Sequence, residues 1–192
     1  MKPLYVTDRL AVRPWTDEPA DVDRVFAIYS QWDVARWLGA QPRAMADRAE
    51  AAAVAKRWAE FTARDDRYGC WAIEVRDGGV AAGSAPGEDR SSRGPQPRVV
   101  GSVLFTPLPG GDGEVEVGWH LHPDSWGHGY ATEAARGAVE RGFASGLTEV
   151  YAVVRPDNEP SMAVCRRLGM TPLGRTTRWY GVEVEAFRLT AG

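Results

Sequence analysis

Cysteine is scarce in this sequence, which has only Cys70 and Cys165 among its 192 residues. Their positions show no pairing pattern, which excludes a fold held together by disulfides. We therefore expect two buried free thiols in a reducing compartment. The chain also lacks an apolar run of about 18 residues, and its opening, MKPLYVTDRL, has no apolar signal-peptide core. We therefore expect a cytoplasmic protein with no membrane partner.

An excess of basic residues is also missing, because the formal net charge is −3 at pH 7. A nucleic-acid-binding surface usually needs such an excess, so we expect no nucleic-acid partner. The three histidines, His120, His122 and His128, lie close together but have neither helical spacing nor cysteine neighbours, and we expect no metal site. The hydrophobic content of 44% is enough for one full core, so residues 1–192 are predicted to form a single domain.

Alternating and helical patterns follow one another in an order that predicts a mixed α/β (α+β) sheet flanked by helices. Strands are predicted over residues 4–14, 70–76, 99–106, 114–121, 150–154, 170–180 and 182–190. Helices are predicted at the apolar stripe Val22, Val25, Phe26 and Tyr29, over 45–64, after Gly129 and after Asn158. The expected architecture therefore has seven strands and about four helices.

Residues 77–98 interrupt this order between the second and third strands. The stretch is rich in Gly, Pro and Ser and contains one valine and no aromatic residue. Such a composition cannot bury enough apolar area to offset the entropy lost on ordering. We predict a flexible insertion, with a functional lid as the alternative.

The stretch from His120 to Arg136, HLHPDSWGHGYATEAAR, predicts a strand–loop–helix junction. Gly127 and Gly129 allow a positive φ and let a ligand approach the backbone without meeting a Cβ. The following helix begins with unpaired N–H groups, which suit phosphate oxygens. The pattern predicts a pyrophosphate cradle, although the turn could need its glycines for geometry alone. Thr132 occupies the third glycine position of a dinucleotide fingerprint, and no P-loop lysine follows, so both of those motifs are excluded.

Two segments, EVEVGWHLHPDSWGHGYATEAARGAVERGF and PDNEPSMAVCRRLGM, resemble the GNAT superfamily of acyl-CoA-dependent N-acyltransferases. The resemblance is closest to the branch that includes ribosomal-protein N-terminal alanine acetyltransferases, and TDRLAVRPW resembles the opening strand of that branch. It covers nearly the whole chain apart from residues 77–98. One departure is Asp124, which stands where the family often has Gln or Arg and which cannot donate to a phosphate. The cradle would then depend on backbone N–H groups, His128 and the helix end.

The resemblance implies a single-domain GNAT-like fold with a mixed, mostly antiparallel seven-stranded sheet, in which a parallel pair, the fourth and fifth strands, splays apart. Acetyl-CoA would be the co-substrate, without a metal, and its pantetheine arm would lie in the gap. An N–H near Leu121 would donate to the acetyl carbonyl. The implied cofactor-binding residues are Leu121, His122, Trp126, Gly127, His128, Gly129, Tyr130, Ala131, Thr132, Asn158 and Ser161.

Acetyl transfer to nitrogen needs a neutral amine, and a positioned base accelerates such a step roughly 10²–10⁴-fold. Glu116 is the first candidate base, because the family often places an acid or its water relay two residues before the glycine of this strand, here Gly118. His120 is the second candidate, because it lies four residues further along and nominally on the same face. Glu116 could equally occupy the polar side of an alternating strand with no catalytic role.

The departing thiolate needs a proton donor, and the resemblance implies that Ser161 provides it while Asn158 orients the cofactor arm. The residues alone allow a simpler interpretation of the same motif. Asn158 is a good helix cap, and a serine in the first helical turn needs no other role.

The acceptor is expected to enter between the early helices and the final hairpin, where Glu183 and Glu185 could favour a cation or simply face water. Side chains that could line this entrance are Trp32, Arg36, Trp37, Glu116, Trp179 and Tyr180. We therefore expect an N-acetyltransferase, monomeric or homodimeric, that transfers acetyl directly in a ternary complex to a primary amine, either a protein N-terminus or a small molecule. The alternative is a catalytically silent acyl-CoA-binding sensor module.

Overall fold

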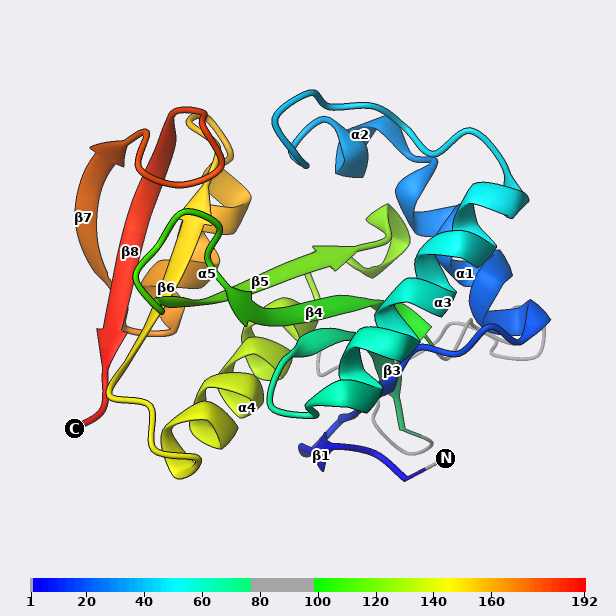
Figure 1. The fold of residues 1–192 in the computed structure, drawn as a ribbon, viewed down its shortest axis with the longest axis horizontal. Coiled ribbons are helices and arrows are strands. Elements are labelled where there is room, and N and C mark those ends of the chain that lie inside the picture. The colour runs from blue at the N-terminus through cyan, green and yellow to red at the C-terminus, as the bar shows by residue number, and fades with distance from the viewer. Residues whose placement is uncertain (1, 77–98) are drawn as a thin grey trace, which may run out of the picture.

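The computed structural model describes residues 2–76 and 99–192, which form one sheet flanked by helices (Figure 1). The strands are β1 (Tyr5–Val6), β2 (Leu10–Pro14), β3 (Gly69–Val75), β4 (Val99–Pro107), β5 (Val115–Leu121), β6 (Glu149–Val154), β7 (Thr171–Thr176) and β8 (Val184–Thr190). The helices are α1 (Pro19–Tyr29), α2 (Trp32–Ala35), α3 (Arg48–Arg64), η2 (a 3-10 turn, Pro123–Ser125), α4 (Tyr130–Ala144) and α5 (Glu159–Arg167). The insertion predicted over 77–98 lies outside the described residues. Within the ranges described, no helix is both long and apolar enough to cross a membrane.

The sheet has the order β1-β2-β3-β4-β5-β6-β8-β7, and β5–β6 is its parallel pair. The other neighbouring strands are antiparallel, so the predicted mixed, mostly antiparallel sheet with a parallel pair is confirmed. It has eight strands rather than seven because the first predicted strand is divided by a turn. In that turn the Thr7 N–H donates to the Leu10 carbonyl at 2.9 Å, and the Leu10 N–H donates to the Thr7 hydroxyl at 3.1 Å. The additional helix, α2, has only four residues, too few for a periodic pattern.

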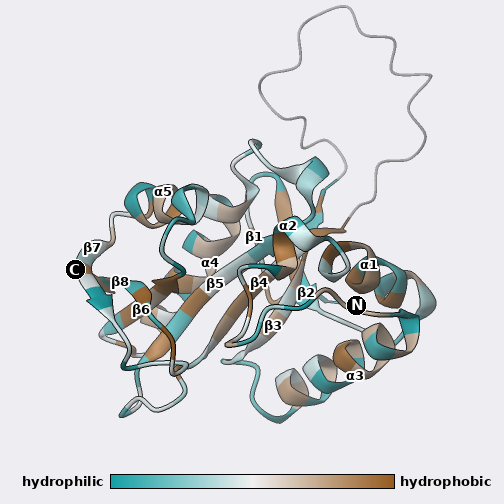
Figure 2. Cartoon of the chain, turned by 90° about the horizontal axis from the view of Figure 1, so that it is seen from above, coloured by the Kyte–Doolittle hydropathy of each residue, from teal (hydrophilic) through white to brown (hydrophobic). Residues whose placement is uncertain are grey.

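Two apolar clusters cover the two faces of the sheet. On one face α4 packs against β2, β4, β5 and β6, and its small residues let it approach closely. A Cβ at Gly142 would collide with the Phe105 ring, so the glycine permits this contact. On the other face α1 and α3 pack against each other and against the strands. Figure 2 shows both teal and brown residues along α3, as expected for an amphipathic helix on a sheet.

The two cysteines contribute to these clusters as buried free thiols, as predicted from the sequence. Cys70 is 2% exposed and Cys165 is 0% exposed, and neither forms a disulfide. Burial raises the pKa of each thiol to about 12. Both side chains are therefore neutral packing groups at pH 7.

The parallel strands β5 and β6 separate soon after they meet. Their register has one paired position, Glu116 with Tyr151, and Figure 1 shows the strands pointing away from each other beyond it. The His122 N–H donates to the Val100 carbonyl of β4 at 3.0 Å, so even-numbered residues of β5 bond to β4. Because bonding directions alternate along a strand, the backbones of Trp119 and Leu121 face the gap.

Candidate active site

Glu116 lies at the point where β5 and β6 meet, and its side chain is directed to the face covered by α1 and α3. Its neighbours Val115 and Val117 belong to the cluster on the α4 face, which places Glu116 on the opposite face. The residue is 8% exposed, and its carboxylate accepts hydrogen bonds from the Tyr180 hydroxyl, at 2.5 Å, and from the Val153 N–H. Burial raises the pKa of Glu116 to about 7, against the opposing effect of these two donors. Glu116 can therefore take up and release a proton near neutral pH.

Tyr180 reaches Glu116 from the loop between β7 and β8, and its backbone is strained. Its φ is +60°, a left-handed conformation that a large side chain rarely adopts. The preceding residue, Trp179, anchors the loop by packing against Tyr151 with ring centres 5.5 Å apart. Trp179 is only 3% exposed and supports the loop, so its contact with an acceptor stays a prediction.

His120 lies on the same face of β5 as Glu116 and contacts α1. Its Nδ1 is 3.1 Å from the Tyr29 hydroxyl, which is itself 2.9 Å from the Ser102 hydroxyl. The Ser102 hydroxyl also accepts a hydrogen bond from Trp15 Nε1 at 3.2 Å. Burial lowers the pKa of His120 to about 4, so the imidazole is neutral at pH 7. A group of such low basicity is a weaker base than Glu116, which makes Glu116 the better candidate at neutral pH.

The loop before α4 has the backbone geometry predicted for a cradle. Gly127 has a φ of +78° and Gly129 a φ of +79°, and Gly129 begins the helix without a side-chain cap. The N–H groups of residues 130–132 consequently have no acceptor inside the helix. The Thr132 hydroxyl is also buried with no hydrogen-bond partner in the described part of the chain. Several donors are therefore left free at one helix end, as an oxygen-rich anion requires.

Side chains of the same loop are tied to its backbone. His128 Nδ1 lies 2.7 Å from the Trp126 carbonyl oxygen, which can only accept, so Nδ1 carries the proton. The ring stacks on Tyr130 with centres 5.4 Å apart. Trp126 Nε1 donates to the Leu121 carbonyl at 2.9 Å. The His122 N–H is bonded to β4, so the backbone N–H groups near the end of β5 that face the gap are those of Trp119 and Leu121.

Asn158 and Ser161 lie at the start of α5, beside β6. The Asn158 side-chain oxygen accepts the Ser161 N–H at 3.3 Å, so Asn158 caps the helix, as the simpler interpretation of the motif required. The Ser161 hydroxyl is half-buried and has no hydrogen-bond partner among the residues described. It therefore remains free to donate to a ligand.

The remaining acceptor-side residues lie around α2 and the final hairpin. Trp32 is 56% exposed, and the Arg36 guanidinium covers the Trp37 ring at 4.6 Å from its centre. After β6, the Arg155 side chain donates to the Gly39 carbonyl at 2.5 Å and so joins the segment after α2 to the end of β6.

The acidic residues of the final hairpin share one arginine. Glu183 lies 3.2 Å and Glu185 2.7 Å from nitrogen atoms of Arg175. One guanidinium offsets one of the two carboxylate charges, so one negative charge remains in this group of three side chains. Attraction of a cationic acceptor to this hairpin stays a prediction.

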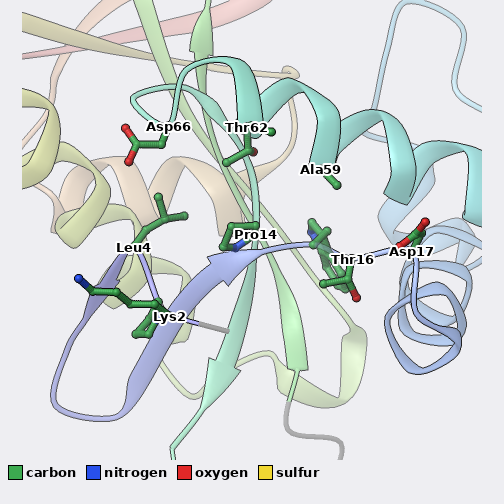
Figure 3. Close-up of a pocket in the computed structure, with 11 residues that line it drawn as sticks. Lys2, Leu4, Pro14, Thr16, Asp17, Ala59, Thr62 and Asp66 are labelled. Carbon is green, nitrogen blue, oxygen red and sulfur yellow. The ribbon is translucent and has the colours of Figure 1, made fainter.

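A cavity of about 780 Å³ lies away from the gap, between the N-terminal segment, the end of β2 and α3. Figure 3 shows Ala59 and Thr62 of α3 above it and Pro14 of β2 below, with Leu4 and Asp66 at its side. None of the predicted site residues lines this cavity. In the ranges that the structure covers, no group of three His, Cys, Asp or Glu side chains could hold a metal ion.

Two contacts of the site were missed in the sequence. Tyr29 belongs to the apolar stripe of α1 and was assigned to the core, although its hydroxyl reaches His120. The Val153 N–H faces Glu116 only because β5 and β6 separate, which no local pattern encodes. A tyrosine at the end of an apolar helical stripe was the one available signal, because its hydroxyl needs a partner when buried.

Comparison with known proteins identifies the family of the chain. A family model described as an acetyltransferase (GNAT) domain matches residues 9–171. The uncharacterized N-acetyltransferase YoaA of Bacillus subtilis (strain 168) is 28% identical over 175 residues, which cover 91% of this chain and 86% of that protein. RimJ of Mycobacterium smegmatis, solved in complex with CoA-disulfide, has a TM-score of 0.68 and 21% identity over 95% of this chain and 82% of that chain.

A further solved structure has the same fold at still lower identity. The microcin C7 self-immunity acetyltransferase MccE, in complex with acetyl-CoA and AMP, has a TM-score of 0.74 and 13% identity, covering 99% of this chain and 97% of that chain. Both structural likenesses extend over nearly the whole chain. The eight-stranded arrangement with its parallel pair is therefore the fold of these enzymes.

Proposed function

The chain belongs to the GNAT acetyltransferase family, and from this premise we propose that it transfers the acetyl group of acetyl-CoA to a primary amine. The observation that carries the proposal is Glu116, a buried carboxylate whose pKa is about 7, at the closed end of the gap, where β5 and β6 meet. A base of this pKa is well matched to proton transfer at neutral pH. Its side chain is directed to the face covered by α1 and α3, which would leave the other part of the gap for the co-substrate.

Acetyl-CoA fits the donors that this chain leaves free. The backbones of Trp119 and Leu121 face the gap and would hold the pantetheine arm. The N–H groups at the start of α4 and the unpartnered Thr132 hydroxyl would hold the pyrophosphate, and Gly129 presents no Cβ to it. When bound, acetyl-CoA supplies an activated thioester. The Leu121 N–H is the donor placed to stabilise charge on a carbonyl oxygen in the gap.

Glu116 would accept the proton that an ammonium group loses before it attacks. An α-amine has a pKa of roughly 8 and a lysine amine one of about 10.4. Transfer to a carboxylate of pKa about 7 therefore costs about 1 kcal/mol for the α-amine and more than 4 kcal/mol for lysine. This difference favours an acceptor such as a peptide N-terminus, or a small molecule whose amine has a similarly low pKa.

Ser161 would act on the leaving group, because its hydroxyl is free and lies on the first turn of α5 beside β6. It would donate a proton as the thiolate departs, and the transfer would be direct, with both substrates bound. No nucleophilic side chain is then required. The two buried cysteines, whose thiols have a pKa of about 12, are consistent with this scheme.

The test is thiol release from acetyl-CoA with a panel of acceptors, and mass spectrometry of the products. The panel contains peptides with free N-termini, N-blocked peptides with one lysine, and small amines of graded pKa. We expect product with low-pKa amines, and its loss in Glu116→Gln but not in the matched control Glu140→Gln, on the exposed face of α4. Tight CoA binding without turnover on any amine would instead indicate the sensor module.

A further inference from the structure

The loop that would hold the pyrophosphate contains no permanent positive charge. Residues 120–132 include neither Lys nor Arg, whereas Asp124 lies before the loop and Glu133 in the first turn of α4. His128 adds no donor in its neutral form, because its Nδ1 proton is held by the Trp126 carbonyl. Asp124 already interacts with the Arg24 guanidinium, whereas at the start of α4 a pyrophosphate would meet the Glu133 carboxylate with only N–H dipoles and a hydroxyl to attract it. A cation from elsewhere in the chain has to correct this balance.

Arg9, which precedes β2, lies against the loop and supplies that cation. Its Nε lies 2.7 Å and its Nη2 2.6 Å from Oε2 of Glu133, and its Nη1 donates to the His128 carbonyl at 3.0 Å. The guanidinium also stands 5.1 Å from the centre of the Tyr130 ring. One side chain thus holds the loop, the first helical turn and the intervening aromatic residue together.

Glu133 is kept ionised by the same contacts. Its Oε1 accepts the Arg9 N–H at 2.9 Å and the Thr7 hydroxyl at 2.5 Å. Burial acts to raise the pKa of Glu133, but the donors from Thr7 and Arg9 outweigh it and hold the pKa below its ordinary value. Removing the Arg9 side chain would therefore take away the guanidinium that offsets this carboxylate and leave Glu133 with the Thr7 hydroxyl and the N–H of residue 9.

Arg9 has donors left over after these contacts. A guanidinium carries five N–H bonds, and its contacts with Glu133 and His128 account for three of them. Its Nη2 lies 3.4 Å from the position that a Cβ on Gly129 would take, and the side chain is 28% exposed. The guanidinium therefore borders the space that the glycine leaves open.

We propose that Arg9 is the cationic residue of the pyrophosphate cradle, offsetting the charge of Glu133 and presenting its remaining N–H groups to the phosphate oxygens. The proposal rests on acetyl-CoA binding in the proposed function, but not on the identity of the acceptor. A simpler role for Arg9 is that of a structural clip between β2 and α4. The two roles predict different effects of a Glu133 substitution on the affinity for CoA.

Calorimetric titration with CoA separates the two roles. If Arg9 acts by charge, Arg9→Met should lower the affinity for CoA at least tenfold, or about 1.4 kcal/mol. Glu133→Gln should leave the affinity unchanged or raise it, because it removes a negative charge and frees the guanidinium. If the pair is only a clip, both substitutions break the same bridge and weaken binding alike, which would overturn the proposal.

Pantetheine, which lacks the pyrophosphate, is the control ligand, and neither substitution should change its affinity. Arg136→Met is the control variant, because that guanidinium donates to the Arg167 carbonyl between α4 and the end of α5. Should Arg9→Met fail to fold by circular dichroism, Arg9→Lys keeps the charge and should retain most of the affinity. An Arg9→Lys variant whose affinity for CoA falls at least tenfold below that of the wild type would contradict the proposal.

The outcomes also separate this proposal from the proposed function. A wild-type protein that binds no CoA would overturn both. A wild-type protein that binds CoA, with an Arg9→Met variant that binds it equally well, would overturn the role of Arg9 alone. Failure to acetylate any amine would leave the binding result for Arg9 intact, because calorimetry needs no acceptor.

Discussion

Replacement of Glu116 by Gln should raise stability while it removes activity. Glu116 is 8% exposed, and burial raises its pKa from 4.5 to about 7. The native protein therefore binds this proton more tightly than the unfolded chain does, and the stability it confers at low pH is lost as the pH rises from about 4.5 to about 7. At about 1.36 kcal/mol for each pKa unit, the wild-type protein loses up to about 3 kcal/mol over this interval.

Gln has no proton to lose, so Glu116→Gln should escape this penalty. We expect the variant to be more stable than the wild type by about 2–3 kcal/mol at pH 8, with the difference mostly gone at pH 5. Urea denaturation at the two pH values measures it, and Glu140→Gln, on the exposed face of α4, should show no such difference. A Glu116→Gln variant that is less stable than the wild type at pH 8 would refute the reasoning.

The activity of the same variant should move in the opposite direction. If Glu116 is the base, Glu116→Gln should lower the rate of thiol release by roughly two to three decades at pH 7. Part of the rate should return as the pH rises, because more of the acceptor amine is already neutral. Wild-type kinetics across the pH range would remove Glu116 from the mechanism and leave His120 or water as the base.

Three further predictions test the rest of the site. Tyr180→Phe removes a donor to the charged form of Glu116, so the acid limb of the kcat/KM profile should move up by about one pH unit. The control Tyr151→Phe should not move it, because the Tyr151 hydroxyl donates to another carboxylate. An acid limb that stays in place in Tyr180→Phe would contradict the contact with Glu116. Gly129→Val, at a φ of +79°, should lower the calorimetric affinity for acetyl-CoA at least tenfold while the fold survives, and unchanged affinity would remove the cradle. Ser161→Ala should slow turnover without rescue at alkaline pH and with little change in CoA binding, and a full rate would show that the thiolate leaves unassisted.

Local periodicity was enough to predict most of the fold. The stripe of the cradle helix predicts burial of Ala134, Ala135 and Ala138, and all three are at most 1% exposed. The parallel pair was implied by the family resemblance and is present. The division of the first strand at Thr7 was missed, because one side-chain hydrogen bond to the Leu10 N–H decides it and leaves no periodic signal.

The contacts that define the site could not be predicted in the same way, because they join residues far apart in the chain. Arg9 lies just before β2, and Glu133 lies in the first turn of α4. The local pattern around each residue gives no sign of their ion pair, because the two are 124 positions apart in the sequence. Periodicity tells which face of an element a residue occupies, but it does not tell which element lies opposite.

The strongest argument for Glu116 is that two unfavourable features meet at its carboxylate. Burial of an acid without a cationic partner costs stability whenever the acid is ionised. Tyr180, the residue that donates to it, keeps a φ of +60° that also costs free energy, of order 1–3 kcal/mol. A sequence optimised only for stability would have an apolar residue in place of Glu116 on β5 and a glycine in place of Tyr180 in the hairpin loop. Their coincidence at the closed end of the gap, where β5 and β6 meet, is what a site retained for proton transfer should show.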